Sequence, residues 1–567
     1  MDRRTIGAIL LMMAIAIAPA LFIKRPPKPA VPPAGQTARV DSATPARPAP
    51  PQPDTSALRP ADTTRAETAV AADTIRVTSP LYTYGISTVG GRLVEATLTK
   101  YRSMAPGDAR AAAQILPPQS RFLAMSVVLG ADTIPLGDLH FTPSAGSLSV
   151  TGPTSLRLSA SKGQVSVTLT YTFRPDDYQI GISGQVTGVG PNGGQLLVEM
   201  GPTLANTEAN EQENHRALAL VTKRNETERT DFASLKPGEP RTISGPLDWA
   251  AVKSKYFVSA VLAFDSAGGG ISGVTATARK TEEKRPTSAD IRLGLPLKPS
   301  GAFEYIVYAG PMEYDRLGAV GHDFDDVNPY GWPGFRTVIR PVAGAVRWLL
   351  VWMHDHLSLP YGLVLIFFGI LVRLLLWPLN QKAMRANLQL QAVQPLMKEI
   401  QDKYKNDPQR LQQEMFKLYK EHSVNPLGGC WPMLLPMPVL FALFFVFQNT
   451  IELRGASFLW LPDLSRPDPL YIIPLIMGLS MFGLSKVGQM GMEPNPQMKM
   501  MLYVMPVMMT FLFLNFASGL NLYYAVSNIS SIPQQWMLAR ERMKRTARQI
   551  VEVKTKEPAA GKQKKKV

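Results

Sequence analysis

The chain has 567 residues, enough for several domains, and carries a formal net charge of +16 although only 18% of its residues are charged. Its single cysteine, Cys430, excludes a disulfide framework and a cysteine-based zinc site, and the closest of six scattered histidines, His354 and His356, cannot share one helical face. The basic charge concentrates beside apolar segments and at the C-terminus, which favours anionic lipid or ribosomal RNA over DNA as the partner.

The N-terminus predicts a membrane anchor followed by a linker. Residues 1–23 contain two arginines and then a run of 19 residues without a charge. Ala18-Pro19-Ala20 resembles a signal-peptide cleavage site, but the run exceeds the usual h-region of roughly 7–15 residues and continues past that site, which favours an uncleaved signal-anchor. Residues 24–74 include eleven prolines between Pro26 and Pro60, so we predict an extended, disordered linker.

Residues 75–334 predict a large antiparallel β-sandwich. Apolar and polar residues alternate with period two, for example in residues 164–173 and 303–308, and turn residues separate the runs. Carboxylate pairs or a histidine–carboxylate cluster do not stand out, which favours a structural or docking role. Large sandwiches also occur in glycan-binding enzymes, and an envelope glycan-binding protein is therefore an alternative.

Residues 335–357 predict an amphipathic helix. Apolar residues recur every three or four positions, with arginines between them and Trp348 and Trp352 alongside. This pattern is typical of a helix that lies in the membrane interface. A helix packed on the preceding domain is the alternative.

Residues 358–380 are apolar and long enough to cross a bilayer, and the only charge between Leu359 and Asn380 is Arg373. A charge in hydrocarbon is costly, so it usually faces protein or water. The side chain either extends to the nearer headgroups or charges a hydrated cavity within a helix bundle. The residue alone does not decide between these two interpretations.

The remaining segments predict further spans and a topology. Residues 381–426 are polar and predict a helical hairpin divided at Asn406-Asp407-Pro408; residues 427–540 contain four apolar segments, and residues 541–567 form a basic tail. The hairpin has eight basic residues and the stretch 540–567 eleven, against two in the loop 451–470. The positive-inside rule then predicts six spans, both termini in the cytoplasm and residues 24–357 in the periplasm. The expected fold is a polytopic α-helical membrane protein with a large periplasmic antiparallel β-sandwich.

The membrane half lacks the usual residues of transport and catalysis. Ion transport normally places carboxylates or histidine in the spans, whereas Glu452, at an outer helix end, is the only nearby carboxylate. A nucleophile–base pair and metal ligands are also absent, so we expect no enzyme, metal or cofactor. Ten methionines between Met477 and Met509 are typical of surfaces that accept varied apolar partners, although plain packing explains them as well. A small-anion transporter or channel that uses Arg373 is the main alternative.

Four motifs carry a resemblance to a known family: residues 373–379 (RLLLWPL), 425–432 (NPLGGCWP), 474–478 (PLIMG) and 518–528 (SGLNLYYAVSN). In their order and spacing they resemble the YidC-type membrane protein insertase, in its Gram-negative long form with a periplasmic domain. The resemblance implies a bacterial inner-membrane insertase and foldase rather than an enzyme.

The resemblance also implies which residues act. A hydrophilic groove, open to cytoplasm and lipid, would receive the polar tail of a nascent membrane protein, whose span then slides along the third and fifth spans. The matching groove positions are Arg373, Gly369 and Tyr524, and we assign Thr510 and Asn521 to the groove as polar residues of the same apolar spans. The matching slide positions are Met437, Pro438, Phe441, Pro506, Val507, Met508 and Leu512. The chain departs from the family at Gly369, where a hydroxyl residue is common, and at Asn515, where an aromatic residue is more typical.

The implied partners are nascent membrane proteins, the Sec translocon and the ribosome. The cytoplasmic hairpin and the basic tail would contact the ribosome, the tail through RNA phosphates. Anchoring of the tail to anionic lipids explains its charge equally well.

Overall fold

The structure is a computed structural model. It describes residues 73–108, 111–118, 120–130, 132–162, 165–189, 193–263, 270–280, 285–331, 334–422, 437–492 and 496–556. The predicted signal-anchor and most of the predicted linker lie outside the described residues, as does the motif at 425–432 with Cys430.

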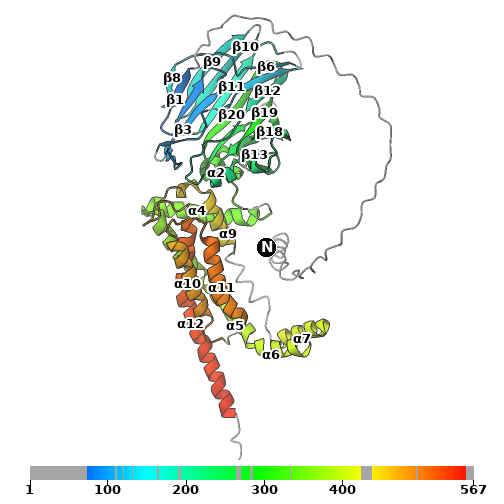
Figure 1. Ribbon diagram of the computed structural model, residues 1–567, viewed down its shortest axis with the longest axis vertical. Helices are drawn as coiled ribbons and strands as arrows, with labels where there is room; N and C mark the ends of the chain where they lie inside the picture. Colours follow the sequence, from blue (N-terminus) through cyan, green and yellow to red (C-terminus); the bar gives the residue numbers. More distant parts are fainter. Residues whose placement is uncertain are drawn as a thin grey trace, which may run out of the picture. The chain divides into compact units, whose positions relative to one another are not determined.

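The first half of the chain forms three β-sheets (Figure 1). The largest has the order β14 (Thr227–Asp231), β13 (Ala219–Lys223), β16 (Trp249–Lys253), β17 (Phe257–Leu262), β20 (Ala302–Pro311), β11 (Gln179–Val186), β10 (Val165–Phe173), β9 (Thr154–Lys162), β7 (Thr142–Pro143). The second has the order β15 (Pro240–Leu247), β18 (Ile271–Ala278), β19 (Ala289–Leu297), β12 (Gly194–Glu199), β5 (Met125–Leu129), β6 (Asp132–Pro135). The third has the order β4 (Ala112–Gln114), β3 (Leu93–Arg102), β2 (Tyr82–Ser87), β1 (Thr74–Thr78), β8 (Ser147–Ser149).

The alternation in the sequence explains these strands. In β10 the side chains of Val167, Leu169, Tyr171 and Phe173 are buried, and the residues between them are more exposed. One hydrophobic core contains residues from all three sheets, so the sheets pack around a common interior. The prediction of antiparallel sheets is confirmed, with one exception in the described pairs: β1 and β8 run parallel.

A short helical segment connects the sheets to the second half. It comprises α3 (Tyr314–Val320), the 3-10 helix η2 (Phe324–Val327) and α4 (Arg336–Leu357). The buried face of α4 packs on α9 (Met437–Asn449), whereas Trp348 is 61% exposed and stacks on Trp352. The helix therefore combines a protein-packed face with an exposed aromatic face, and its position at the membrane interface stays a prediction.

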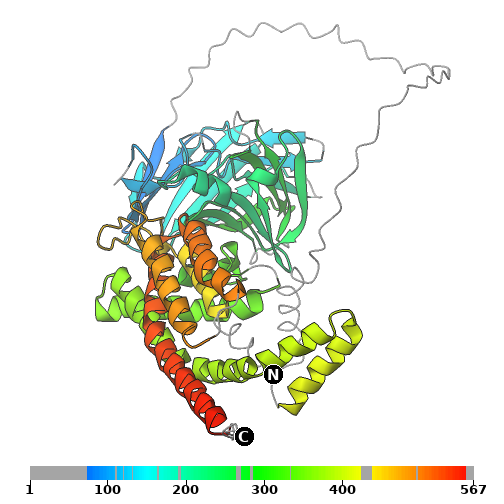
Figure 2. The same cartoon turned by 60° about the horizontal axis from the view of Figure 1, so that its bottom comes forward.

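The second half is helical. Helix α5 (Tyr361–Ala392) and helix α10 (Ile472–Gly488) both pack on α12 (Ser518–Lys556), and α11 (Pro496–Phe513) packs on α10. Helix α6 (Gln394–Lys403) and helix α7 (Pro408–Glu421) pack against each other (Figure 2). The Asp407 carboxylate accepts a hydrogen bond from the Arg410 N–H and so begins α7 at the predicted turn.

One helix among the described residues, within α5 at Tyr361–Pro378, is long and apolar enough to cross a membrane. The apolar helices at Met437–Asn449, Ile472–Gly488 and Met498–Phe513 are shorter. Six spans therefore stay a prediction. Beyond the apolar part of α12 the helix continues to Lys556, through most of the stretch predicted as a basic tail, because after Pro533 this segment holds no glycine or proline to interrupt it.

Candidate functional site

The side chain of Arg373 lines a cavity of about 130 Å³ between three helices. We call it the Arg373 cavity. Its lining consists of Val372, Arg373 and Leu376 from α5, Met437, Val439 and Leu440 from α9, and Tyr523, Tyr524 and Ser527 from α12. Residues 523, 524 and 527 share one face of α12 because residue 527 follows the other two at spacings of four and three.

The Arg373 cavity offers hydrogen-bond donors and a positive charge, and none of the described residues that line it is a carboxylate. The Nε of Arg373 and the Oη of Tyr524 are buried, and neither has a hydrogen-bond partner among the described residues. A buried donor without a partner is costly, by roughly 1–3 kcal/mol and more for a charged group. The arrangement therefore suits a ligand that supplies acceptor oxygens, such as a carboxylate.

The structure brings together Arg373 and Tyr524 of the predicted groove residues. Asn521 is buried and donates from Nδ2 to the Phe513 carbonyl at 3.0 Å, one turn from the cavity lining. Gly369 faces α12, where an added Cβ would lie 3.2 Å from Val526 Cγ1. Sequence reasoning did not assign Tyr523 and Ser527 to the groove, although their spacing from Tyr524 is a helical signal that could have identified them.

The predicted slide positions lie on two helices. Met437 on α9 lines the Arg373 cavity, and Pro438 and Phe441 on the same helix are half-buried. On α11 the side chains at 507, 508 and 512 are exposed, and Pro506 is buried. The exposed fractions on α11 are 57% for Val507, 50% for Met508 and 53% for Leu512.

Thr510 lies between α10 and α11. Its hydroxyl donates to the Pro506 carbonyl at 2.8 Å, and an added Cβ on Gly478 would lie only 1.9 Å from that hydroxyl oxygen. The glycine of the 474–478 motif therefore permits the close approach of the two helices.

Gly478→Val is expected to separate α11 from α10, because the new side chain would displace Thr510 and break its hydrogen bond. Overpacking of this kind costs about 1–3 kcal/mol. The midpoint of thermal unfolding in detergent should fall. Gly483→Ala is the matched control on α10, since an added Cβ there meets nothing within 4 Å. Equal midpoints for the two variants would contradict the close packing.

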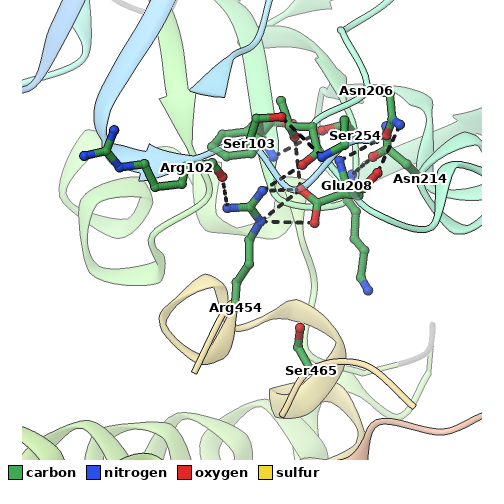
Figure 3. A network of polar contacts seen from close by, with 12 residues as sticks. Arg102, Ser103, Asn206, Glu208, Asn214, Ser254, Arg454 and Ser465 are labelled. Atoms are coloured by element: carbon green, nitrogen blue, oxygen red, sulfur yellow. Dashed lines mark hydrogen bonds and ion pairs between the residues drawn. The ribbon is translucent and has the colours of Figure 1, made fainter. Parts of the chain in front are cut away.

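An ion-pair network joins the sandwich to the loop that follows α9 (Figure 3). The guanidinium of Arg454 donates from Nε to both carboxylate oxygens of Glu208, at 2.9 and 3.1 Å. It also donates to the carbonyls of Arg102 at 2.8 Å and Thr207 at 2.9 Å. The side chains of Arg454 and Glu208 are 3% and 8% exposed. The pair is therefore buried and fully hydrogen-bonded, and no periodic pattern in the sequence indicated it.

A second ion-pair network fixes α4. Arg347 pairs with Asp315 of α3 and, at 3.2 Å, with Glu452 in the 3-10 helix η4 (Ile451–Leu453). Burial raises the pKa of Glu452, and Arg347 opposes that rise. Arg340 pairs with Asp325 of η2. Arg336 also pairs with Asp326, at 3.5 Å. All three arginines between the apolar positions of this helix thus bind carboxylates of the neighbouring segments.

Amide groups extend these contacts to the end of α9. Asn449 donates from Nδ2 to the Pro329 carbonyl at 3.0 Å, and Asn328 donates to the Asn449 carbonyl at 3.2 Å. Lys253 of β16 donates to Asn328 Oδ1 at 2.8 Å. Burial, with Arg229 nearby, lowers the pKa of Lys253 well below its usual value. Contacts from the sandwich to α9 are thus continuous.

The chain matches two family models. Residues 352–546 match the 60Kd inner membrane protein model, and residues 74–341 match the YidC periplasmic domain model.

Relatives match across most of the chain. A membrane protein insertase YidC of Chlorobium phaeovibrioides is 35% identical over 71% of this chain and 72% of its own length, and one of Chlorobaculum tepidum is 31% identical over 94% of both. Among solved structures, an active YidC insertase crystal structure with its first transmembrane domain resolved matches 82% of this chain and 93% of its own, at 17% identity and a TM-score of 0.34.

Proposed function

The chain belongs to the YidC family of membrane protein insertases, and from this membership we propose that its Arg373 cavity receives the polar tail of a client during insertion. Insertion of membrane proteins is the function of the family, and the comparisons give no support to the small-anion transporter that the sequence left open. We further propose that the protein acts as a binding surface without catalysing a reaction.

The observation that carries this proposal is the Arg373 guanidinium in a cavity that has no carboxylate among the described residues of its lining. A unit charge pair at 4 Å is worth about 4 kcal/mol at an effective dielectric constant of 20. A single cation therefore attracts an acidic or otherwise oxygen-rich tail, yet binds it weakly enough to release it. The cavity also shortens the apolar barrier that the tail has to cross. This matters because a polar or charged group in hydrocarbon is costly.

The surroundings of the cavity support a route for the client's apolar span. Met437 on α9 lines the cavity, and α11 presents exposed side chains at Val507, Met508 and Leu512. Methionine side chains adapt to varied apolar partners. We propose that the span leaves along α9 and α11, in contact with these residues and with Pro438 and Phe441. Pro506, although it is a predicted slide position, is buried in the structure.

The topology and the remaining partners are also part of the proposal. The distribution of basic residues supports six spans with both termini in the cytoplasm and the β domain in the periplasm. Clients are nascent membrane proteins. The basic tail and the hairpin α6–α7 would contact the ribosome or anionic lipids, and the Sec translocon is the expected neighbour.

The slide is tested by crosslinking. A photoreactive residue at Met508 is expected to crosslink to the span of a stalled client at least several-fold more than one at Leu479. Leu479 is the matched control because it is 71% exposed on the neighbouring helix α10. Equal yields at both positions would mean that α11 presents only a lipid-facing surface.

A further inference from the structure

A second cavity, of about 190 Å³, lies where the C-terminal end of α9 meets the sandwich and the turn between α11 and α12. We call it the outer cavity. Its lining consists of Glu213 and Lys255 from the sandwich, Phe444, Phe447 and Gln448 from α9, Ser465 and Pro467 from the following loop, and Asn515, Phe516, Ala517 and Leu520 from the turn and the start of α12.

The lining of the outer cavity combines aromatic walls with polar groups of both kinds. Gln448 and Asn515 are exposed, and their side-chain amides make no hydrogen bond among the described residues. An amide supplies both a donor and an acceptor, as a peptide group does. Lys255 Nζ pairs with Glu213 Oε1 at 2.7 Å, so charges of both signs are present. These groups match an extended polar peptide better than an apolar ligand.

The outer cavity and the Arg373 cavity share two helices. On α9, Leu440 lines the Arg373 cavity and Phe444 lines the outer cavity. These two residues are one turn apart, which is about 6 Å along the helix. On α12, Leu520 lines the outer cavity and Tyr523 the Arg373 cavity, three residues or about 4.5 Å apart along the helix. The two cavities are thus consecutive along the same pair of helices.

A row of aromatic rings separates the two cavities. Tyr524 lines the Arg373 cavity and packs edge-on against Phe513, with ring centroids 5.4 Å apart. Phe513 stacks on Phe516 at 4.9 Å, and Phe516 contacts Phe444 at 5.9 Å. The last two rings line the outer cavity. The rings of this row thus reach from the lining of one cavity to the lining of the other.

We propose that the outer cavity is a second binding site for the client's polar tail, which occupies it after leaving the Arg373 cavity. The inference rests on the proposed function. A cavity of this size accommodates several water molecules or one or two amino-acid residues at a time, so the tail would pass through it as an extended chain. Gln448 and Asn515 would hydrogen-bond to its peptide groups, and the Lys255–Glu213 pair would exchange partners with its charged side chains.

The test is disulfide crosslinking in proteoliposomes with the full chain. Cys430→Ser removes the single cysteine, and one new cysteine is introduced by Asn515→Cys, Leu440→Cys or Leu459→Cys. The client is a single-span protein with an acidic tail that contains one cysteine. Leu459 is 75% exposed in the loop after α9 and is the control for non-specific collision. The tail should crosslink first to the cysteine at 440 and later to the one at 515, each with at least five-fold the yield at 459.

A second comparison tests the cavity itself. In the Gln448→Cys chain, Asn515→Phe should fill the cavity and lower the crosslink at least five-fold, whereas Asn515→Ser should preserve it. In the Leu440→Cys chain, the crosslink at 440 should be the same with Asn515→Phe as with Asn515→Ser, which also shows that the chain is folded.

The outcomes distinguish this inference from the proposed function. A crosslink at 440 with yields at 515 and 448 no higher than at 459 would overturn the outer site and leave the Arg373 route intact. Crosslinking at 515 before 440 would overturn the proposed order. Normal insertion without a crosslink at 440 would overturn the Arg373 route and, with it, the outer site.

Discussion

Arg373→Ala is expected to reduce the insertion of an acidic-tailed, single-span client into proteoliposomes by at least tenfold, and Arg373→Lys is expected to retain most of it. A tenfold change in rate needs only about 1.4 kcal/mol, well below the roughly 4 kcal/mol of a close charge pair at intermediate dielectric constant. The ammonium of lysine restores the charge without the planar donor geometry of arginine. Retention by lysine would therefore identify charge, rather than a specific hydrogen-bond pattern, as the functional property.

Loss of insertion in the alanine variant would not reflect unfolding. Arg373 forms no ion pair among the described residues, and its buried Nε has no hydrogen-bond partner. Removing a buried charge that has no partner releases a desolvation cost instead of creating one. The control is Leu375→Ala on the same helix, because Leu375 is 75% exposed and does not line the cavity. Normal insertion by Arg373→Ala would mean that the side chain only extends to the headgroups and that other residues form the groove.

Arg373 on α5 and Thr510 on α11 show what the sequence could and could not predict. Arg373 is the only charge in a long apolar segment, and this made it visible without a structure. Thr510 is different. Its polar residue type suggested a groove position, but its hydroxyl donates a hydrogen bond to the carbonyl of Pro506, four residues earlier. Threonine in a helix often satisfies its hydroxyl in this way, so a polar residue in an apolar segment does not by itself indicate a cavity.

The β domain shows a similar division. Alternation predicts strands because it depends only on neighbours in the chain. The order of strands in a sheet cannot be predicted in this way, since β11 pairs with β20, more than a hundred residues later. Contacts between the sandwich and the helical core are still less visible. Glu208 and Arg454 are 246 residues apart and carry no local pattern that relates them.

Arg454→Ala is expected to lower the local stability of the loop after α9 by about 3–5 kcal/mol, since it leaves the buried Glu208 carboxylate without its partner. Besides the ion pair, the substitution removes two hydrogen bonds to backbone carbonyls and the contact of the guanidinium with the Phe257 ring, whose centroid lies 5.4 Å away. Hydrogen exchange of residues 451–464 and 206–208 measures the free energy of local opening directly. Protection in both segments should decrease together.

Two further variants test whether the unpaired, buried charge of Glu208 causes the loss of protection. Glu208→Gln combined with Arg454→Met removes both charges and should recover part of the lost protection, because replacing a whole buried pair costs far less than breaking it. Lys236→Ala breaks the exposed pair with Glu239, whose side chains are 76% and 68% exposed, and should leave protection nearly unchanged.

If Arg454→Ala preserved protection, the amide contacts of Asn328 and Asn449 would be sufficient to hold the loop. If protection is lost instead, the ion pair is what fixes the sandwich to the loop joining α9 to α10, and movements of the sandwich would then reach the helix that lines both cavities.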